Sequence, residues 1–272
     1  MFPYIFRFFK LGIPLSLLVL FWGGCGSKEK VLLEIDYSGA ADWQYLLGAD
    51  IYGTAVVSQD SAPQAFSGSL RTYLHGLKDG SDSSVIRFGL KDVTFIAPFL
   101  SDDEKEDIYN RLTVMQVLLS QDGISLSDTT GMPGVLSGGW DIMRCVARVV
   151  PVLPNAEMAV NSSWEREQRF SLSLPEGRGD VHLYQFFTLD SLYNNRGVLS
   201  AALSWAFNYR VSLIDDDAPS LRKYPLSGSG RGNAVLDIKK KRLFKSKANF
   251  QVAHSQNPGY ELNEVVHLEA VE

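Results

Sequence analysis

The chain has few of the residues that usually mark metal and catalytic sites. Its 272 residues include two cysteines and four histidines. No histidine stands at metal-ligand spacing from another, and there is no H-E-x-x-H motif. The sequence therefore predicts no metal and no cofactor, and we interpret the histidines as single solvated or hydrogen-bonded strand residues. They are His75, His182, His254 and His267.

A surplus of positive charge is also missing. Lysine and arginine number 26 against 31 acidic residues, for a formal net charge of −5. A nucleic-acid-binding protein normally has a basic surplus, so this balance argues against that class. We expect no nucleic-acid partner.

No apolar run reaches the roughly 20 residues that a membrane-spanning helix needs. The longest apolar run extends from Leu11 to Trp22 and follows Arg7 and Lys10. Its length matches the apolar core of a secretory signal peptide. Gly23 and Gly24 then lead to Cys25, an arrangement that resembles the lipobox of bacterial lipoproteins, although Trp22 stands where a leucine is typical. The alternatives are an ordinary signal or uncleaved anchor, and a buried apolar helix with an incidental cysteine.

The lipobox resemblance implies where in the cell the protein is located. The thiol of Cys25 would receive a diacylglyceryl group, and cleavage would leave it as the new N-terminus. Lipid on Cys25 would then make a membrane the first partner. Gly26, rather than an aspartate, follows the cysteine, which by resemblance to Gram-negative sorting favours the outer membrane facing the periplasm. Loss of Arg7 and Lys10 would leave 24 basic against 31 acidic residues, a charge of −7.

The remaining sequence predicts mainly β structure. Residues 203–213 alternate apolar and polar side chains, which is typical of a strand with one buried face. Residues 85–96 alternate too, but their register shifts near Lys91 and Asp92, which indicates a β-bulge. Asp122-Gly123 predicts a tight hairpin within 118–126, and residues 235–244 read as strand, charged turn and strand.

Helices are expected in two places only. Ser101 and Glu104 form a capping box before a segment that extends to residue 112. Residues 136–149 carry apolar side chains at helical spacing and are the second candidate.

The predicted fold class is thus mainly β, a β-rich α+β arrangement. We expect long curved antiparallel strands in two related β-sheet or half-barrel units, with one or two short helices. The expected boundaries are 1–24 for the signal peptide, 25–30 for a tether, 31–150 for the first β-rich half and 151–272 for the second. The halves could be two packed domains or two parts of one larger sheet.

Three short stretches resemble a family of β-rich bacterial lipoproteins of unknown function. They are the proline-flanked link 150–154, Ser163-Trp164 at the start of the second half, and the glycine-rich stretch 228–232 before a charged hairpin. The resemblance implies a cell-envelope protein, and it transfers no functional residues. From composition we expect 228–232 to be a flexible loop, because its pattern fits neither a nucleophile elbow nor a dinucleotide-binding turn.

Two groups of residues are candidate binding surfaces. Trp205, Phe207 and Tyr209 share one face of a strand and could contact an apolar ligand or a partner protein; the alternative is a core position. Lys239, Lys240, Lys241 and Arg242 could contact an anionic lipid surface, or could form a solvated turn. The acidic clusters 102–104 and 215–217 read as solvated, and Cys145 as a buried, inert thiol.

The sequence therefore predicts a membrane-anchored envelope lipoprotein without catalytic activity. It would bind an apolar ligand, such as a lipid, or another envelope protein. The alternatives are a structural envelope protein, and a hydrolase whose active site has no recognisable motif.

Overall fold

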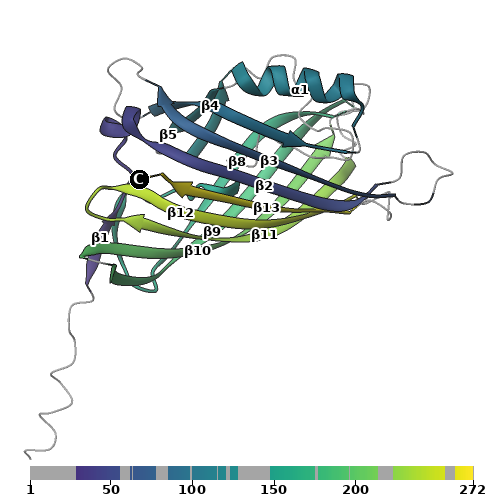
Figure 1. The fold of residues 1–272 in the computed structure, drawn as a ribbon. Helices are drawn as coiled ribbons and strands as arrows, with labels where there is room; N and C mark the ends of the chain where they lie inside the picture. Colours follow the sequence, from purple (N-terminus) through teal and green to yellow (C-terminus); the bar gives the residue numbers. More distant parts are fainter. Residues whose placement is uncertain are drawn as a thin grey trace, which may run out of the picture.

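The structure is a computed structural model in which long antiparallel strands form one strongly curved sheet (Figure 1). It describes residues 29–55, 62, 64–77, 85–98, 100–114, 116–120, 123–127, 148–174, 177–195, 197–213, 223–254 and 261–271. The predicted mainly β class is confirmed. The strands are β1 Lys30–Leu33, β2 Gln44–Ala55, β3 Gln64–Leu77, β4 Val85–Ile96, β5 Gln116–Ser120, β6 Gly123–Ser127, β7 Ala156–Ala159, β8 Ser163–Leu174, β9 Gly177–Asn195, β10 Val198–Leu213, β11 Lys223–Asp237, β12 Arg242–His254 and β13 Glu261–Ala270.

The two halves of the chain are parts of a single sheet. Its strand order is β6-β5-β4-β3-β2-β13-β12-β11-β10-β9-β8, so β2–β6 of the first half continue into β8–β13 of the second. The join is the antiparallel pairing of β2 with β13, which runs from Tyr45 opposite Ala270 to Thr54 opposite Glu261. A separate two-stranded sheet pairs β1 with β7. Every other pair of neighbours in the large sheet is consecutive in sequence, and β4 and β5 are connected through a helix.

Alternation in sequence becomes alternation of burial. In β10 the side chains of residues 201, 203, 205, 207, 209 and 211 are buried, whereas those of residues 206, 208 and 210 are exposed. Such period-two burial is what a sheet with one packed and one solvated face requires. The strand 203–213 expected from the sequence is confirmed and begins five residues earlier, at Val198.

The predicted bulge and hairpin are both present. In the pairing of β3 with β4, the register shifts between Arg71 and Tyr73 of β3. On β4, Asp92 has a positive φ of 54°. The hydroxyl of Thr72 donates to the carbonyl of Lys91 at 2.9 Å, which satisfies a group that the bulge frees. Ser120 pairs with Gly123 at the end of the β5–β6 hairpin.

The helix predicted from the capping box is α1, Asp102–Val114, which packs against β4. The backbone NH of Ser101 donates to Glu104 Oε2 at 2.8 Å, and the NH of Glu104 donates to Ser101 Oγ at 3.3 Å. Both bonds of the box are therefore made. The acidic residues 102–104 form the first turn, where negative charge complements the helix dipole.

The proline-flanked link lies in the core and is not an exposed linker. Val149, Val150, Val152 and Leu153 are all buried against the inner face of the sheet. Arg148, just before them, forms a buried ion pair with Glu264 of β13, and its guanidinium lies 4.3 Å from the ring centroid of Phe250. Of the expected helix 136–149, only residues 148 and 149 are among those described, and they are helical.

The glycine-rich stretch 228–232 is the middle of β11, and the expected flexible loop is wrong. A Cβ on Gly230 would lie 2.3 Å from the Phe207 ring, and one on Gly232 would lie 2.1 Å from Trp205. The glycines alternate on the inner face, where aromatic rings of the adjacent strand cover them. Composition alone suggests a turn, but packing against these rings makes glycine the residue that fits.

Candidate functional site

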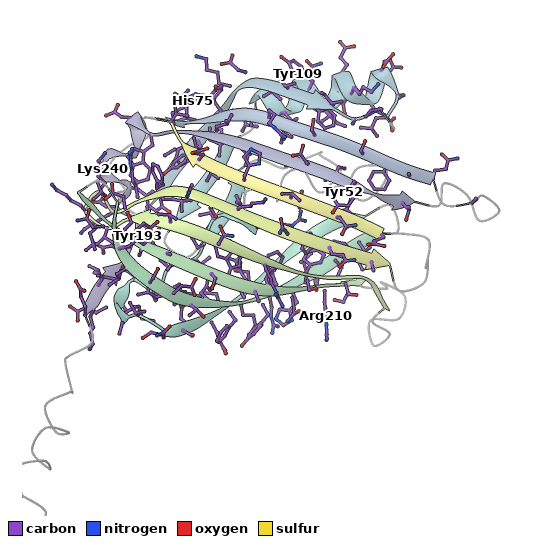
Figure 2. All side chains as sticks on the ribbon, turned by 60° about the horizontal axis from the view of Figure 1, so that its bottom comes forward. Tyr52, His75, Tyr109, Tyr193, Arg210 and Lys240 are labelled. Atoms are coloured by element: carbon purple, nitrogen blue, oxygen red, sulfur yellow. The ribbon has the colours of Figure 1, made fainter. Side chains whose placement is uncertain are left out.

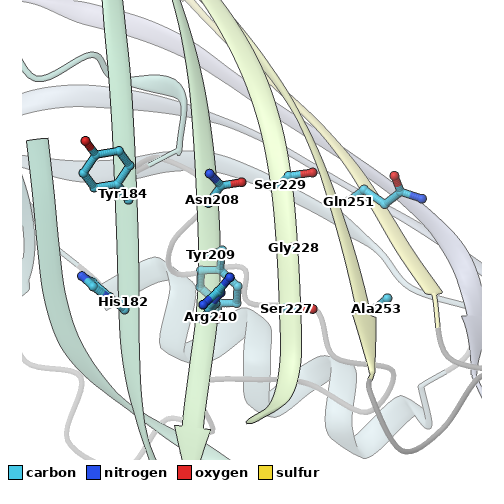
Figure 3. A pocket seen from close by; sticks show the side chains of 10 residues that line it. All are labelled: His182, Tyr184, Asn208, Tyr209, Arg210, Ser227, Gly228, Ser229, Gln251 and Ala253. Carbon is cyan, nitrogen blue, oxygen red and sulfur yellow. The ribbon is translucent and has the colours of Figure 1, made fainter. Parts of the chain in front are cut away.

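A shallow trough lies on the outer face of the sheet, across β9 to β12 (Figure 3). Its volume is about 600 Å³. That is within the range of small-molecule sites, although the trough is open to solvent along its length. Its lining side chains belong mostly to the outward-facing positions of the four strands: His182, Tyr184, Asn208, Arg210, Ser227, Ser229, Gln251 and Ala253.

Strand register brings these residues together from four distant segments. Arg210 stands opposite His182 on one side and Ser227 on the other. One row along, Asn208 stands opposite Tyr184 and Ser229. Residues at paired positions point to the same face, so the two rows lie side by side.

The hollow exists because β11 carries small side chains where its neighbours carry large ones. Ser227, Gly228 and Ser229 form the floor of the trough. Gly228 has no side chain, and the buried ring of Tyr209 also borders the trough. Arg210 and Gln251 rise on either side of these serines.

One wall of the trough is an aromatic ring in a fixed position. The hydroxyl of Tyr184 donates a short hydrogen bond to Glu165 Oε2 on β8. This hydrogen bond raises the pKa of Tyr184, because the carboxylate favours the protonated phenol. The side chain of Tyr184 remains 38% exposed, and Phe186, two residues along, is 43% exposed. The ring is thus held by its hydroxyl with its apolar part accessible.

The same wall also carries an exposed ion cluster on β8 and β9, next to Tyr184. Glu167 Oε1 lies 2.6 Å from Arg169 Nη2 and 2.6 Å from His182 Nε2. Hydrogen bonds from Arg169, and then from His182, lower the pKa of Glu167. The negative charge of Glu167 is therefore already engaged on the side of the trough that is nearest to Arg210.

Beside this wall, on β10 and β11, lie polar side chains without a partner among the described strands. Across the described strands, the side chains of Asn208, Arg210, Ser227 and Ser229 make no hydrogen bond or ion pair with one another or with any neighbour. Gln251 donates from Nε2 to Glu261 at 2.9 Å and keeps its carbonyl oxygen for another donor. The trough thus presents a cation, two hydroxyls and an amide to solvent.

The aromatic residues expected to form a binding surface belong to the core. Trp205, Phe207 and Tyr209 are 4%, 2% and 5% exposed. Phe207 stacks on Phe250 with centroids 5.4 Å apart, and Tyr209 meets the same ring edge-on at 5.3 Å. The reason is the alternation itself: these residues occupy the packed face, and the polar residues between them form the outer surface.

The basic run Lys239–Arg242 forms the turn between β11 and β12. Lys239 and Lys240 are exposed, whereas Lys241 forms an ion pair with Glu34 beside β1. A hydrogen bond from the Lys241 ammonium to this carboxylate raises the pKa of Lys241. Arg242 is partly buried. Three of the four cations are therefore exposed, but only Lys239 and Lys240 are exposed without a described ion pair.

Several sequence candidates lie outside the described residues, namely Cys25, Cys145 and the acidic run 215–217. Among the histidines, His267 packs on Gly48, where a Cβ would lie 2.2 Å from the ring, and His75 has a buried Nδ1 without a hydrogen-bond partner in the described structure. The described side chains contain no group of three or more His, Cys, Asp or Glu placed to hold a metal ion.

Sequence reasoning missed the trough. Alternation places Asn208 and Arg210 on the polar face of a strand, but the stretch 228–232, which contains Ser229, is expected from composition to be a loop. If this stretch were a loop, no strand would lie between β10 and β12, and the trough would have no floor. The alternation of serine and glycine in 227–230 is the signal that could have revealed a strand with a small-residue outer face.

Comparison with known proteins gives no family. No protein-family model matches the chain, and no curated protein matches it significantly. An outer membrane channel from Pseudomonas putida F1 is similar over 88% of this chain and 100% of its own, with 9% identity and a TM-score of 0.24. DynF, from the dynemicin biosynthesis pathway of Micromonospora chersina, is similar over 90% and 85%, with 7% identity and a TM-score of 0.19. At these scores neither likeness carries an argument about function.

Within the described helices, none is long and apolar enough to cross a membrane.

Proposed function

We propose that the protein is a lipid-anchored binding protein of the bacterial envelope, and that its ligand occupies the outer trough. The observation that carries this proposal is the set of uncommitted polar side chains over the trough floor. They lie on a sheet whose opposite face is packed, so the surface that offers them has a fixed geometry. Such preformed, partly concave surfaces with a few convergent polar groups are typical of ligand sites.

Membrane anchoring would come from lipid on Cys25. Cys25 is five positions before Lys30, where β1 begins. Even fully extended, five residue steps span about 18 Å at roughly 3.6 Å each. Lipidation would therefore hold the end of the molecule at which β1 lies close to the bilayer. A diacylglyceryl group, at about 0.8 kcal/mol per buried methylene, makes such an anchor durable.

The basic turn lies at that same end. The backbone NH of Asp36 donates to the carbonyl of Lys241 at 2.9 Å, which ties the turn to the chain just after β1. Figure 2 places Lys240 and Tyr193 together at this end, next to β1. Lys239 and Lys240 would then contact anionic lipid headgroups, at about 1 kcal/mol per charge near such a surface.

The trough is held away from this end. Ser227 is ten residues from Asp237 along β11, which is about 33 Å at 3.3 Å per residue. Arg210 accordingly lies far from Lys240 and points outward (Figure 2). A ligand in the trough would therefore be reached from the aqueous side.

The ligand of this site is polar. The apolar ligand expected from Trp205, Phe207 and Tyr209 would need an exposed aromatic face on β10, and these side chains are buried. The inner-face cavity bordered by Tyr37, Tyr45 and Phe88 measures about 10 Å³, room for one water at most. No catalytic step is part of this proposal.

Metabolic labelling with a clickable fatty acid tests the anchor. We expect label on the protein and its loss in Cys25→Ala, with the variant released from the membrane fraction. Label that persists in Cys25→Ala would contradict anchoring through this residue.

Native mass spectrometry of the protein purified from its own envelope tests the binding site. We expect a bound polar molecule that is lost when Ser229→Trp fills the trough. The matched control is Asn233→Trp, on the outer face of the same strand but outside the trough. Equal loss in both variants, or recovery of no ligand, would favour a structural envelope protein.

A further inference from the structure

The trough combines a fixed aromatic ring, hydroxyl and amide groups, and the cation of Arg210, which forms no ion pair with the described strands. We infer that it binds a saccharide that carries an anionic group, either a carboxylate or a phosphate. This inference rests on the proposed binding function and specifies its ligand class.

Arg210 supplies the charge recognition. Its guanidinium has no carboxylate within ion-pair distance among the strands that the structure describes. The two acids of β8 beside the trough are engaged, since Glu167 binds Arg169 and His182, and Glu165 accepts from Tyr184. A planar guanidinium with free donors binds carboxylate or phosphate oxygens in a bidentate manner.

The serines and Asn208 supply groups for sugar hydroxyls. Adjacent strands lie about 4.8 Å apart, and alternate residues of one strand lie about 6.7 Å apart. Ser227, Ser229 and Asn208 therefore form a grid of polar groups that can contact non-adjacent hydroxyls of one or two sugar units. Each hydroxyl or amide can both donate and accept, which matches a ligand whose hydroxyls do the same.

Tyr184 supplies the apolar contact that a sugar needs. The ring borders the grid, and its hydroxyl is engaged by Glu165, so the ring is held in place. The C–H face of a pyranose is apolar and packs on exposed aromatic rings. An aromatic side chain with two torsions also loses little conformational entropy on binding.

An acyl chain fits this surface poorly. The floor consists of Ser227, Gly228 and Ser229, and an acyl chain over it would bury the two serine hydroxyls without hydrogen bonds. A saccharide satisfies the same hydroxyls.

The test is binding of the full chain, purified in detergent, to an array of defined oligosaccharides. The array holds neutral members, members with uronic acids and members with phosphorylated sugars, so that the two sources of the anion are distinguished. We expect at least tenfold stronger binding of one anionic class over its neutral counterpart. Inorganic phosphate alone should compete only weakly.

Two variants assign the roles. Arg210→Gln should remove the preference for the anionic class while weak neutral binding remains. Tyr184→Leu should weaken both classes. The matched control is Arg231→Gln, an exposed outer-face arginine on β11 outside the trough. Circular dichroism of each variant confirms that it is folded.

Equal binding of neutral and anionic sugars, or an anionic preference that survives Arg210→Gln, would overturn the inference. If no saccharide binds but the envelope-purified protein carries another molecule that Ser229→Trp displaces, the binding function stands and the saccharide class is wrong. If neither experiment recovers a ligand, both proposals fail.

Discussion

The two faces of β11 should differ in how well they tolerate a larger side chain. On the inner face, Gly230 lies directly under the ring of Phe207 and beside the carbonyl of Asn249 on β12. On the outer face, Ser229 is exposed to solvent. Residues that are adjacent in this sequence therefore alternate between a closely packed environment and solvent.

Gly230→Ala should destabilise the fold by about 1–3 kcal/mol, the usual cost of overpacking a filled core. Its Cβ would come within 2.3 Å of both the Phe207 ring and the Asn249 carbonyl, and the second of these is backbone that cannot rotate away. Urea denaturation measures the effect. Ser229→Ala is the matched control and should stay within about 0.5 kcal/mol of the wild type; equal effects would contradict the assigned packing.

His267 gives the fold a predictable response to pH. Partial burial, and then the charge of Arg71, lower the pKa of His267 in the folded state. The unfolded chain therefore takes up a proton first as the pH falls below about 6.5, so stability is lost in that direction. We expect Tm to fall from pH 8 to pH 5, and to fall less in His267→Gln. An unchanged slope in the variant would show that His267 does not titrate in this way.

At the scale of elements, the segment 148–153 ties the inside of the sheet together. The buried Arg148–Glu264 ion pair fixes one end of this segment to β13, and the indole NH of Trp164 donates to the carbonyl of Val152 at 2.8 Å at the other. The segment covers inner-face residues that would otherwise contact water.

Glu264→Gln should cost about 3–5 kcal/mol, because it removes the carboxylate that pairs with the buried charge of Arg148. Chemical denaturation measures this loss. Glu269→Gln, an exposed site on the same strand, is the control and should have little effect. The double variant Arg148→Met with Glu264→Leu should regain most of the stability, since it removes both charges; failure to recover would indicate that the pair has another role.

Local elements could be predicted from the sequence because their signals are local. Alternation identified the strand 203–213, the register shift near Asp92 identified a bulge, and Ser101 with Glu104 identified a helix start. The strand character of 228–232 could not be predicted, because it depends on rings that β10 places over the glycines. The buried position of the 150–154 link likewise depends on tertiary contacts between distant segments. The trough could not be predicted either, because it requires 228–232 to be a strand.

At the scale of the whole molecule, one strand pairing unites the sheet. β13 stands between β2 and β12 and is hydrogen-bonded to both. Its inward side chains Leu262, Val266 and Leu268 are buried with those of both halves.

Removal of β13 should therefore separate the two halves. A chain that ends at residue 258 should lose its single cooperative unfolding transition, as followed by circular dichroism on heating. A chain that ends at residue 270 keeps β13 and is the control; it loses only the bond from Val271 to Gln44 among the described backbone contacts. A cooperative transition in the shorter chain would show that each half folds by itself.

The pairing of β2 with β13 also sets the order of events during synthesis. Tyr45 pairs with Ala270, 225 positions later, so β2 is synthesised long before its partner strand exists. Contacts this distant slow folding, and an unpaired strand edge is prone to aggregation. Until the C-terminal residues are synthesised, the edge of β2 that later pairs with β13 is therefore the part of the sheet most open to pairing with other chains.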